Sequence, residues 1–142
     1  MNSSTLKTNL TIKSSSNQLK KVESFLFNLK TQLNVTEDMY MNILIAVTEA
    51  VNNAIIHGNK SILRKRVNIQ VKFLDPFCTF IIEDEGNGFN YKAVNDPTSP
   101  ENLHRAGGRG IFFMKQLCSM LQFEKQGSAV KMFFKLDNRQ TN

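Results

Sequence analysis

The sequence contains no tryptophan and only two cysteines, Cys78 and Cys118, which stand apart from each other in apolar surroundings. Isolated cysteines of this kind favour two buried thiols in a reducing compartment over a disulfide framework. Residues 1–13 are polar and lack the apolar centre of a signal peptide, so none is expected. No apolar run approaches the length of a membrane span. These absences together predict a cytoplasmic protein that does not insert into a membrane.

The sequence also lacks the signatures of a nucleic-acid-binding protein. Its formal net charge is +6, but the basic residues are scattered from Lys7 to Arg139, and only residues 64–66 form a tight cluster. Zinc-ligand spacing, the aromatic pattern of an RNA-binding sheet and a helix-turn-helix signature are all missing. We therefore expect no direct contact with nucleic acid. A basic surface that attracts an anionic ligand or an acidic partner explains the charge better.

The remaining composition suits one globular domain. The chain has 142 residues, of which 41% are hydrophobic and 21% charged. That length is sufficient for a hydrophobic core without disulfides or structural metals. Eleven phenylalanines predict a core rich in that residue. We assign residues 1–136 to a single domain and residues 137–142 to a polar, frayed tail.

Hydrophobic periodicity predicts the order strand, helix, helix, strand, strand, long loop, helix, strand, strand. The predicted strands are 6–12, 67–74, 77–83, 121–125 and 129–136, and the predicted helices are 19–33, 37–57 and 111–120. The first strand suits a sheet edge. Residues 14–17 are candidate caps for the first helix, and Thr36 is the candidate cap for the second. This pattern predicts an α+β fold, a two-layer α/β sandwich with helices on one face of a mixed, mainly antiparallel sheet.

The second helix has two unlike sides, because at about 100° per residue its apolar and polar residues fall into separate stripes. The apolar stripe contains Leu44, Val47, Val51 and Ile55. The opposite stripe contains Glu49, Asn53 and His57. The oxygens of Glu49 and Asn53 suit a hard cation such as Mg²⁺, and Glu49 alternatively suits proton abstraction. A solvated helix face is equally compatible, and His57 fits a cap or a partner for the helix dipole.

A glycine-rich turn, DEGNG at residues 84–88, directly follows the third predicted strand. Gly86 and Gly88 permit a flat ligand to approach the backbone closely. The carboxylate of Asp84 can accept a hydrogen bond from an exocyclic amine such as that of adenine. A plain tight turn fits the same residues.

A second glycine-rich segment, GGRG at residues 107–110, opens the third helix. Backbone N–H groups at such a helix start favour an anion, and Arg105 or Arg109 would add positive charge. The Rossmann fingerprint and the P-loop do not fit, because the required βαβ unit and the Gly-Lys-Ser/Thr triplet are missing. A loop that moves on glycine hinges is the alternative interpretation.

In their order along the chain, these motifs resemble those of the GHKL ATPases, the Bergerat-fold group. Within that group the chain is most similar to the bacterial anti-sigma-factor serine/threonine kinases. TEAVNNAIIHGNK resembles their N box, EDEGNGF their first glycine box and GGRGIFFMKQL their second. DPTSPENL resembles the loop that some members carry before the second box. The resemblance covers about residues 6–136.

The resemblance implies a protein that binds ATP together with Mg²⁺. Asn53 would ligate Mg²⁺ and bridge it to the phosphates, and Glu49 would be the general base that activates the attacking hydroxyl. Asp84 would bind the adenine amine in a pocket lined by Gly86 and Gly88. The phosphate-binding residues would be Gly107, Gly108, Arg109 and Gly110, under a lid formed by about residues 90–107.

The resemblance also implies partner switching by a homodimer. Such a protein sequesters a sigma factor in one state and phosphorylates a serine or threonine of a STAS-domain antagonist in another. No phosphoacceptor histidine helix is present, and 142 residues leave no room for sensor domains, which argues against a self-contained histidine kinase. The alternatives are an ATP-binding partner-switch module without kinase activity, a component of a multidomain phosphatase-regulator system, a scaffold, or a basic nucleic-acid-binding module.

Overall fold

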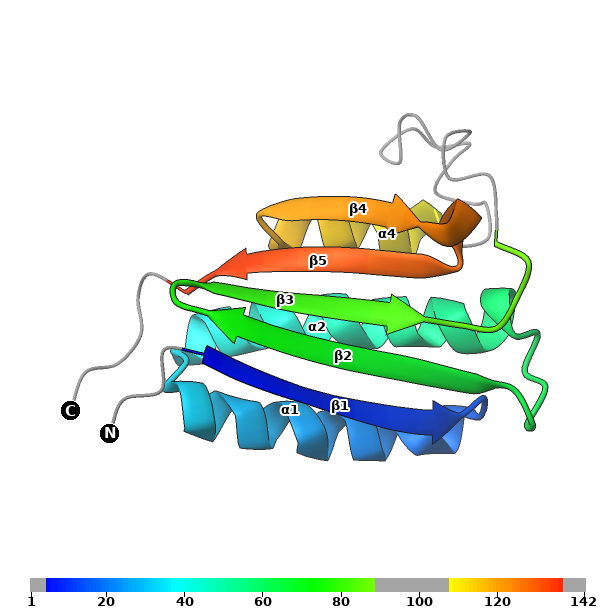
Figure 1. The fold of residues 1–142 in the computed structure, drawn as a ribbon, viewed down its shortest axis with the longest axis horizontal. Helices are drawn as coiled ribbons and strands as arrows, with labels where there is room; N and C mark the ends of the chain where they lie inside the picture. Colours follow the sequence, from blue (N-terminus) through cyan, green and yellow to red (C-terminus); the bar gives the residue numbers. More distant parts are fainter. Residues whose placement is uncertain (1–4, 89–107, 137–142) are drawn as a thin grey trace.

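The computed structural model describes residues 5–88 and 108–136 (Figure 1). The strands are β1 (Thr5–Lys13), β2 (Arg66–Leu74), β3 (Phe77–Glu83), β4 (Met120–Glu124) and β5 (Ala129–Lys135). The helices are α1 (Leu19–Leu33), α2 (Glu37–Asn53) and α4 (Gly108–Leu117), with short helical segments η1 (Ser16–Gln18), η2 (Ala54–Gly58) and η4 (Lys125–Gly127). The predicted order of strands and helices is confirmed for these residues, and the predicted long loop lies outside them.

The five strands form one sheet in the order β1-β2-β3-β5-β4, and every neighbouring pair is antiparallel. The three helices cover one face of this sheet, and the described elements leave the other face open (Figure 1). The predicted α+β sandwich and the edge position of β1 are confirmed. The last strand, β5, lies between β3 and β4 rather than at the end of the sheet.

The core lies between the sheet and the helices. Alternate residues of β2 are buried, and the rings of Phe80 and Phe134 on β3 and β5 meet edge to face with their centroids 5.7 Å apart. Phe73 is also buried, which confirms the prediction of a phenylalanine-rich core. Both cysteines are free, and burial raises the pKa of Cys78 to about 12. Cys118 is only partly buried, so the prediction of two buried thiols was wrong for this residue.

Several element boundaries differ by a few residues from the prediction, and those of the last helix differ at both ends. The helix expected over residues 111–120 is α4, which begins at Gly108 and ends at Leu117. It ends early because Met120 already pairs with Phe133 at the start of β4.

Thr36 caps α2 as predicted, since its side chain accepts a hydrogen bond from the backbone N–H of Met39. The side chains of Ser15 and Gln18, which precede η1 and α1, make no capping hydrogen bond.

The helix α2 continues into η2 without a break, so Glu37–Gly58 forms a run of 22 residues. By length and composition alone this run is apolar enough to cross a membrane, which corrects the expectation that no run approaches such a length. Core helices pass the same test, and here Ala46, Val47 and Val51 are completely buried. Figure 1 shows α2 behind the middle of the sheet, between α1 and α4.

Candidate functional site

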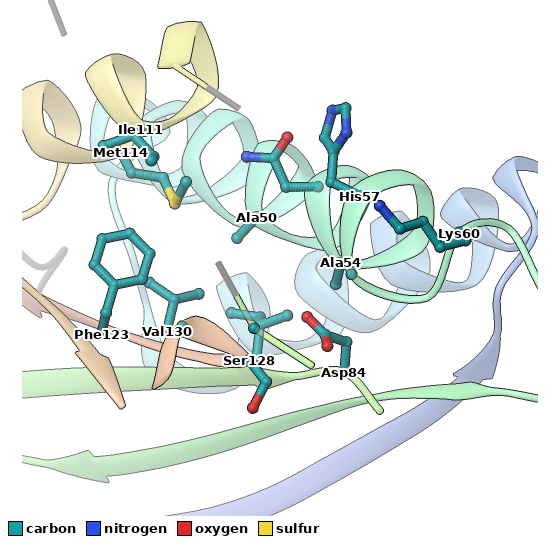
Figure 2. A pocket seen from close by; sticks show the side chains of 15 residues that line it. Ala50, Ala54, His57, Lys60, Asp84, Ile111, Met114, Phe123, Ser128 and Val130 are labelled. Carbon is teal, nitrogen blue, oxygen red and sulfur yellow. The ribbon is translucent and has the colours of Figure 1, made fainter. Parts of the chain in front are cut away.

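A cavity of about 230 Å³ opens between the end of the central helix, α4 and the ends of strands β3, β4 and β5 (Figure 2). Its apolar wall consists of Ala50, Ala54, Ile82, Ile111, Met114, Phe123 and Val130. Its polar lining consists of Asn53, His57, Lys60, Asp84 and Ser128, and Gly58, Gly88 and Gly127 complete it. A cavity that is mostly apolar and has a few convergent polar groups suits a flat ligand with a polar edge.

Asp84 is the acidic residue that lines this cavity, and Figure 2 shows its side chain between Ala54 and Ser128. Its backbone N–H donates to the carbonyl of Ser128 at 2.9 Å, and its Oδ1 accepts from the N–H of Gly86 at 2.8 Å. Burial raises the pKa of Asp84; the neighbouring charge of Glu83 also raises it, whereas the Gly86 hydrogen bond lowers it. A partly buried carboxylate beside an apolar wall can recognise a hydrogen-bond donor on a ligand.

Glycines bring the helix end and the loop after β3 into backbone contact. A Cβ on Gly58 would collide with the Asp84 carboxylate, and a Cβ on Gly86 would collide with the Gly58 carbonyl. Gly88 has φ +82°, and a Cβ there would collide with the carbonyl of Gln126. Gly88 lines the cavity. Gly86 is not among the lining residues; it lies against Gly58 and so holds the loop close to the helix.

The predicted metal ligand and base lie beside the first turn of α4. A Cβ on Gly110 would lie 2.7 Å from Asn53 Nδ2 and 3.3 Å from Glu49 Oε2, so the two helices approach closely at this point. Asn53 lines the cavity, whereas Glu49, one helical turn earlier, is partly buried and does not. The structure thus brings Glu49, Asn53 and Gly110 together.

The rest of the predicted phosphate site is only partly described. Gly108, Arg109 and Gly110 form the start of α4, where backbone N–H groups are not used within the helix. Gly107 and the predicted lid over residues 90–107 lie outside the described residues. His57 is exposed and lines the cavity well apart from Asp84 (Figure 2).

The central helix widens where it meets the cavity. Instead of a regular α-helix to His57, residues Ala54–Gly58 form a π-helical turn. The N–H of Asn59 donates to the carbonyl of Ala54 at 2.8 Å, five residues earlier. Such turns are frequent at functional sites. This one directs Gly58 and Asn59 towards the loop that carries Asp84, as the contacts of both residues with that loop show.

The side chains at the cavity fit a magnesium ion that is bound together with phosphates. Among residues 5–88 and 108–136, no group of three or more His, Cys, Asp and Glu side chains is placed to hold a metal. Mg²⁺ needs only one or two protein oxygens when phosphates and water supply the others. Asn53 and Glu49, whose side chains both approach Gly110, each carry such an oxygen, so the donor set suits a metal–phosphate complex and does not suit an all-protein metal site.

Sequence reasoning missed the apolar wall, Lys60, Ser128 and the buried residue Asn59. The wall residues gave no separate signal, because they continue the same periodicity that marks the core. Asn59 lies two residues after the end of the predicted helix 37–57, where an asparagine fits an ordinary helix end. Ser128 lies between the last two predicted strands, and its hydrogen bond with the loop after β3 depends on the position of β5 in the sheet.

Comparison with known proteins agrees with this geometry. The profile of the family described as "Histidine kinase-like ATPase domain" matches residues 12–134. An anti-sigma F factor of Clostridium novyi is 34% identical over 112 residues, which are 75% of this chain and 78% of that protein. Serine-protein kinase RsbW of Staphylococcus epidermidis is 30% identical over 96 residues, and the match spans only 60% of its length.

A solved structure supports the fold. The crystal structure of the RsbU and RsbW domains of a Mycobacterium tuberculosis protein superposes with a TM-score of 0.69. The superposition covers 96% of this chain and 34% of that one, at 14% sequence identity. At that identity the likeness concerns the arrangement of helices and strands alone.

Proposed function

The chain belongs to the histidine kinase-like ATPase domain family, and we propose on that basis that it binds ATP with Mg²⁺ and phosphorylates a serine or threonine of a partner protein. The observation that carries the proposal is the position of Asp84. Its carboxylate stands at the end of β3 on the polar edge of an apolar cavity, within backbone reach of the helix that bears Asn53 and Glu49.

In this proposal the adenine ring occupies the apolar part of the cavity. Ile82, Met114 and Val130 offer aliphatic contacts to its faces, and Asp84 accepts a hydrogen bond from the exocyclic amine. A hydrogen bond to a charged acceptor contributes about 1.5–3 kcal/mol. Gly88 lets the loop after β3 pack closely against the turn between β4 and β5, because a side chain there would collide with Gln126.

The phosphates lie towards the start of α4. The unpaired N–H groups and positive dipole of a helix N-terminus favour anions, and Gly108 to Gly110 form that end. Asn53 and the phosphates would hold Mg²⁺, which neutralises charge on the transferred group when it is bound. The expected roles of Gly107 and Arg109 belong to the same phosphate site.

Glu49 acts as the general base. It removes the proton from the partner's hydroxyl while that oxygen attacks the γ-phosphorus, the bond from the γ-phosphorus to the bridging oxygen breaks, and ADP leaves. Its carboxylate lies beside Gly110 in the first turn of α4, where the phosphates are proposed to bind, which supports this role. The residues need only position the reactants and balance charge, since this reaction requires no covalent enzyme intermediate.

The relatives suggest the partners. One is named an anti-sigma F factor and others are named serine-protein kinases. We propose that this chain sequesters a sigma factor, phosphorylates a STAS-domain antagonist and works as a cytoplasmic homodimer. We also retain the assignment of residues 1–136 to one ATP-binding domain.

One observation favours a second candidate function, ATP binding without phosphoryl transfer. Glu49 is partly buried against α4 and does not line the cavity, so a protein with this geometry can hold nucleotide without exposing a base to a partner's hydroxyl. Such a protein would switch partners through nucleotide binding alone.

Thermal melting with MgATP tests the proposal, because a ligand that binds only the folded state stabilises it by about 2.7 kcal/mol at a hundred times its dissociation constant. We expect MgATP to raise the melting temperature of both the wild-type protein and the Glu49→Gln variant. Only the wild-type protein should transfer ³²P to a STAS-domain substrate. No rise with MgATP in the wild type contradicts ATP binding. Equal transfer by both proteins removes Glu49 from the base role, and a rise without any transfer favours the second candidate.

A further inference from the structure

Asn59 is a buried polar residue that the proposed reaction does not use. It follows η2 directly, and its side chain is completely buried. It is not among the residues that line the cavity. Buried carboxamides are normally hydrogen-bonded, because an unpaired buried polar group costs about 1–3 kcal/mol. The partners of Asn59 therefore indicate what it does.

The carboxamide of Asn59 joins three segments of the chain. Its Nδ2 donates to Ser14 Oγ at 2.8 Å and to the carbonyl of Arg66 at 2.9 Å. Its Oδ1 accepts from the backbone N–H of Glu85 at 2.7 Å. Ser14 in turn donates to the carbonyl of Lys65 at 2.7 Å. Asn59 thus uses two donors and one acceptor at once, a combination that only a carboxamide supplies at this length.

The hydrogen bond from the Glu85 N–H to Asn59 matters most for the cavity, because Glu85 directly follows Asp84 in the chain. The peptide group before Asp84 is held by the hydrogen bond from its N–H to Ser128. The peptide group after Asp84 is held by the hydrogen bond from the Glu85 N–H to Asn59. Both peptide groups that flank the Asp84 Cα are therefore anchored, and this fixes the direction in which its side chain leaves the backbone.

We propose that Asn59 is a positioning residue for base recognition. By holding the Glu85 N–H it directs the Asp84 carboxylate into the cavity and sets the preference for a base with an exocyclic amine. This inference rests on the proposed function. It also explains why the chain turns inward after Gly58, since the end of the helix that bears Asn53 and the loop that bears Asp84 are joined through this one side chain.

The test compares ATP with inosine triphosphate, which has a carbonyl oxygen in place of the adenine amine. Dissociation constants of both nucleotides with Mg²⁺ are measured by calorimetry for the wild type and for Asn59→Ala. We expect the wild type to prefer ATP. Asn59→Ala should weaken ATP binding by about tenfold, the size of one hydrogen bond, and change inosine triphosphate binding less than about twofold. An equal loss for both nucleotides means that Asn59 supports only the general structure, and it overturns the proposal.

Ser14→Ala is the matched control. It removes one partner of the Asn59 Nδ2 and leaves the bond from Glu85 to Asn59 in place. We expect it to preserve the wild-type preference for ATP, even where its melting temperature falls. Loss of the preference in Ser14→Ala would contradict the specific role of the Glu85 bond.

Amide hydrogen exchange of the ligand-free protein separates this inference from the proposed function. The Glu85 side chain is exposed, yet its N–H should exchange slowly because Asn59 accepts it. Exchange as fast as in an open loop overturns the proposal even if Asn59→Ala fails to fold. Slow exchange of Glu85 in a wild-type protein that binds neither nucleotide contradicts the proposed function and leaves the anchoring of Asp84 in place.

Discussion

The partly buried surroundings of Asp84 disfavour the charged form of its carboxylate. Burial raises its pKa above the ordinary value of an aspartate. Between the ordinary and the raised value, the folded protein binds the proton more tightly than the unfolded chain, so this residue makes stability fall as pH rises through that window. Above the window the charge remains unfavourable without a ligand. A group that destabilises the free protein at a cavity is a candidate for ligand recognition.

Asp84→Asn should therefore separate stability from binding. The amide keeps an oxygen for the Gly86 N–H and removes the charge, so the melting temperature of the ligand-free variant at neutral pH should equal or exceed that of the wild type. Affinity for ATP should fall about tenfold or more, because the amine of adenine loses a charged acceptor. Melting curves over about pH 4–8 and calorimetry check both effects. Glu23→Gln, which removes an exposed charge on α1, is the control.

Unchanged ATP affinity in Asp84→Asn would remove this residue from the adenine site. A large drop in the ligand-free melting temperature would mean that the carboxylate supports the loop rather than the ligand.

Sequence patterns located Asp84 and Asn53 but not Asn59. The first two belong to local motifs, a strand end with glycines and a helical stripe. Asn59 bonds with Ser14, 45 residues away, and with Glu85, 26 residues away. Its role depends on chain segments that meet only in the folded protein, and glycine followed by asparagine after a helix needs no further explanation from the local sequence.

Among the elements, α4 shows how packing overrides local preference. The predicted helix began at residue 111, after the glycines of residues 107–110, and glycine disfavours helices by about 1 kcal/mol relative to alanine. The structure includes Gly108 and Gly110 in the helix. Gly110 is buried where α4 meets α2, and the space that a side chain would fill is taken by Asn53 and Glu49.

Gly110→Ala should thus affect ligand binding more than folding. The added Cβ would lie 2.7 Å from Asn53 Nδ2, the end of a flexible side chain that can move. Helix propensity offsets the crowding by up to about 1 kcal/mol, so the ligand-free melting temperature should change little. MgATP affinity should fall about tenfold, because the carboxamide leaves its position. Calorimetry checks the affinity, with Gln116→Ala, exposed on the same helix, as control.

A Gly110→Ala variant that binds MgATP as tightly as the wild type would show that Asn53 does not contribute to the metal–phosphate site. A variant with a much lower ligand-free melting temperature would show instead that the two helices cannot separate enough to admit a methyl group.

For the whole molecule, the sequence predicted the type and order of the elements better than their arrangement. Periodicity is local, so it identified the five described strands and the three long helices. The insertion of β5 between β3 and β4 joins residues that are distant in sequence, such as Glu83 and Ala129. No local pattern distinguishes this arrangement from a sheet in which each strand lies beside the next.

The net charge of +6 gives a prediction for the molecule as a whole. Several basic side chains are already paired, as Lys30 is with Glu37 and Lys125 with Glu83, at 2.7 and 2.6 Å. We expect duplex DNA to bind only at low salt and to be released at about 0.15 M, whereas the MgATP effect on melting persists there. Fluorescence anisotropy with labelled DNA measures DNA binding at each salt concentration. Tight DNA binding at that salt would favour the nucleic-acid alternative.

The position of β5 has a consequence for how the chain folds while it is being synthesised. Chains leave the ribosome amino end first, so residues 37–59 and the loop at 84–88 emerge before the strand that completes the sheet. Until β5 is made, the cavity lacks Val130 and the partner that holds Phe123 on β4 in place. The groups that would contact nucleotide are then present, but the apolar wall is incomplete. We expect ATP binding to stabilise a nascent chain only after β5 has joined the sheet.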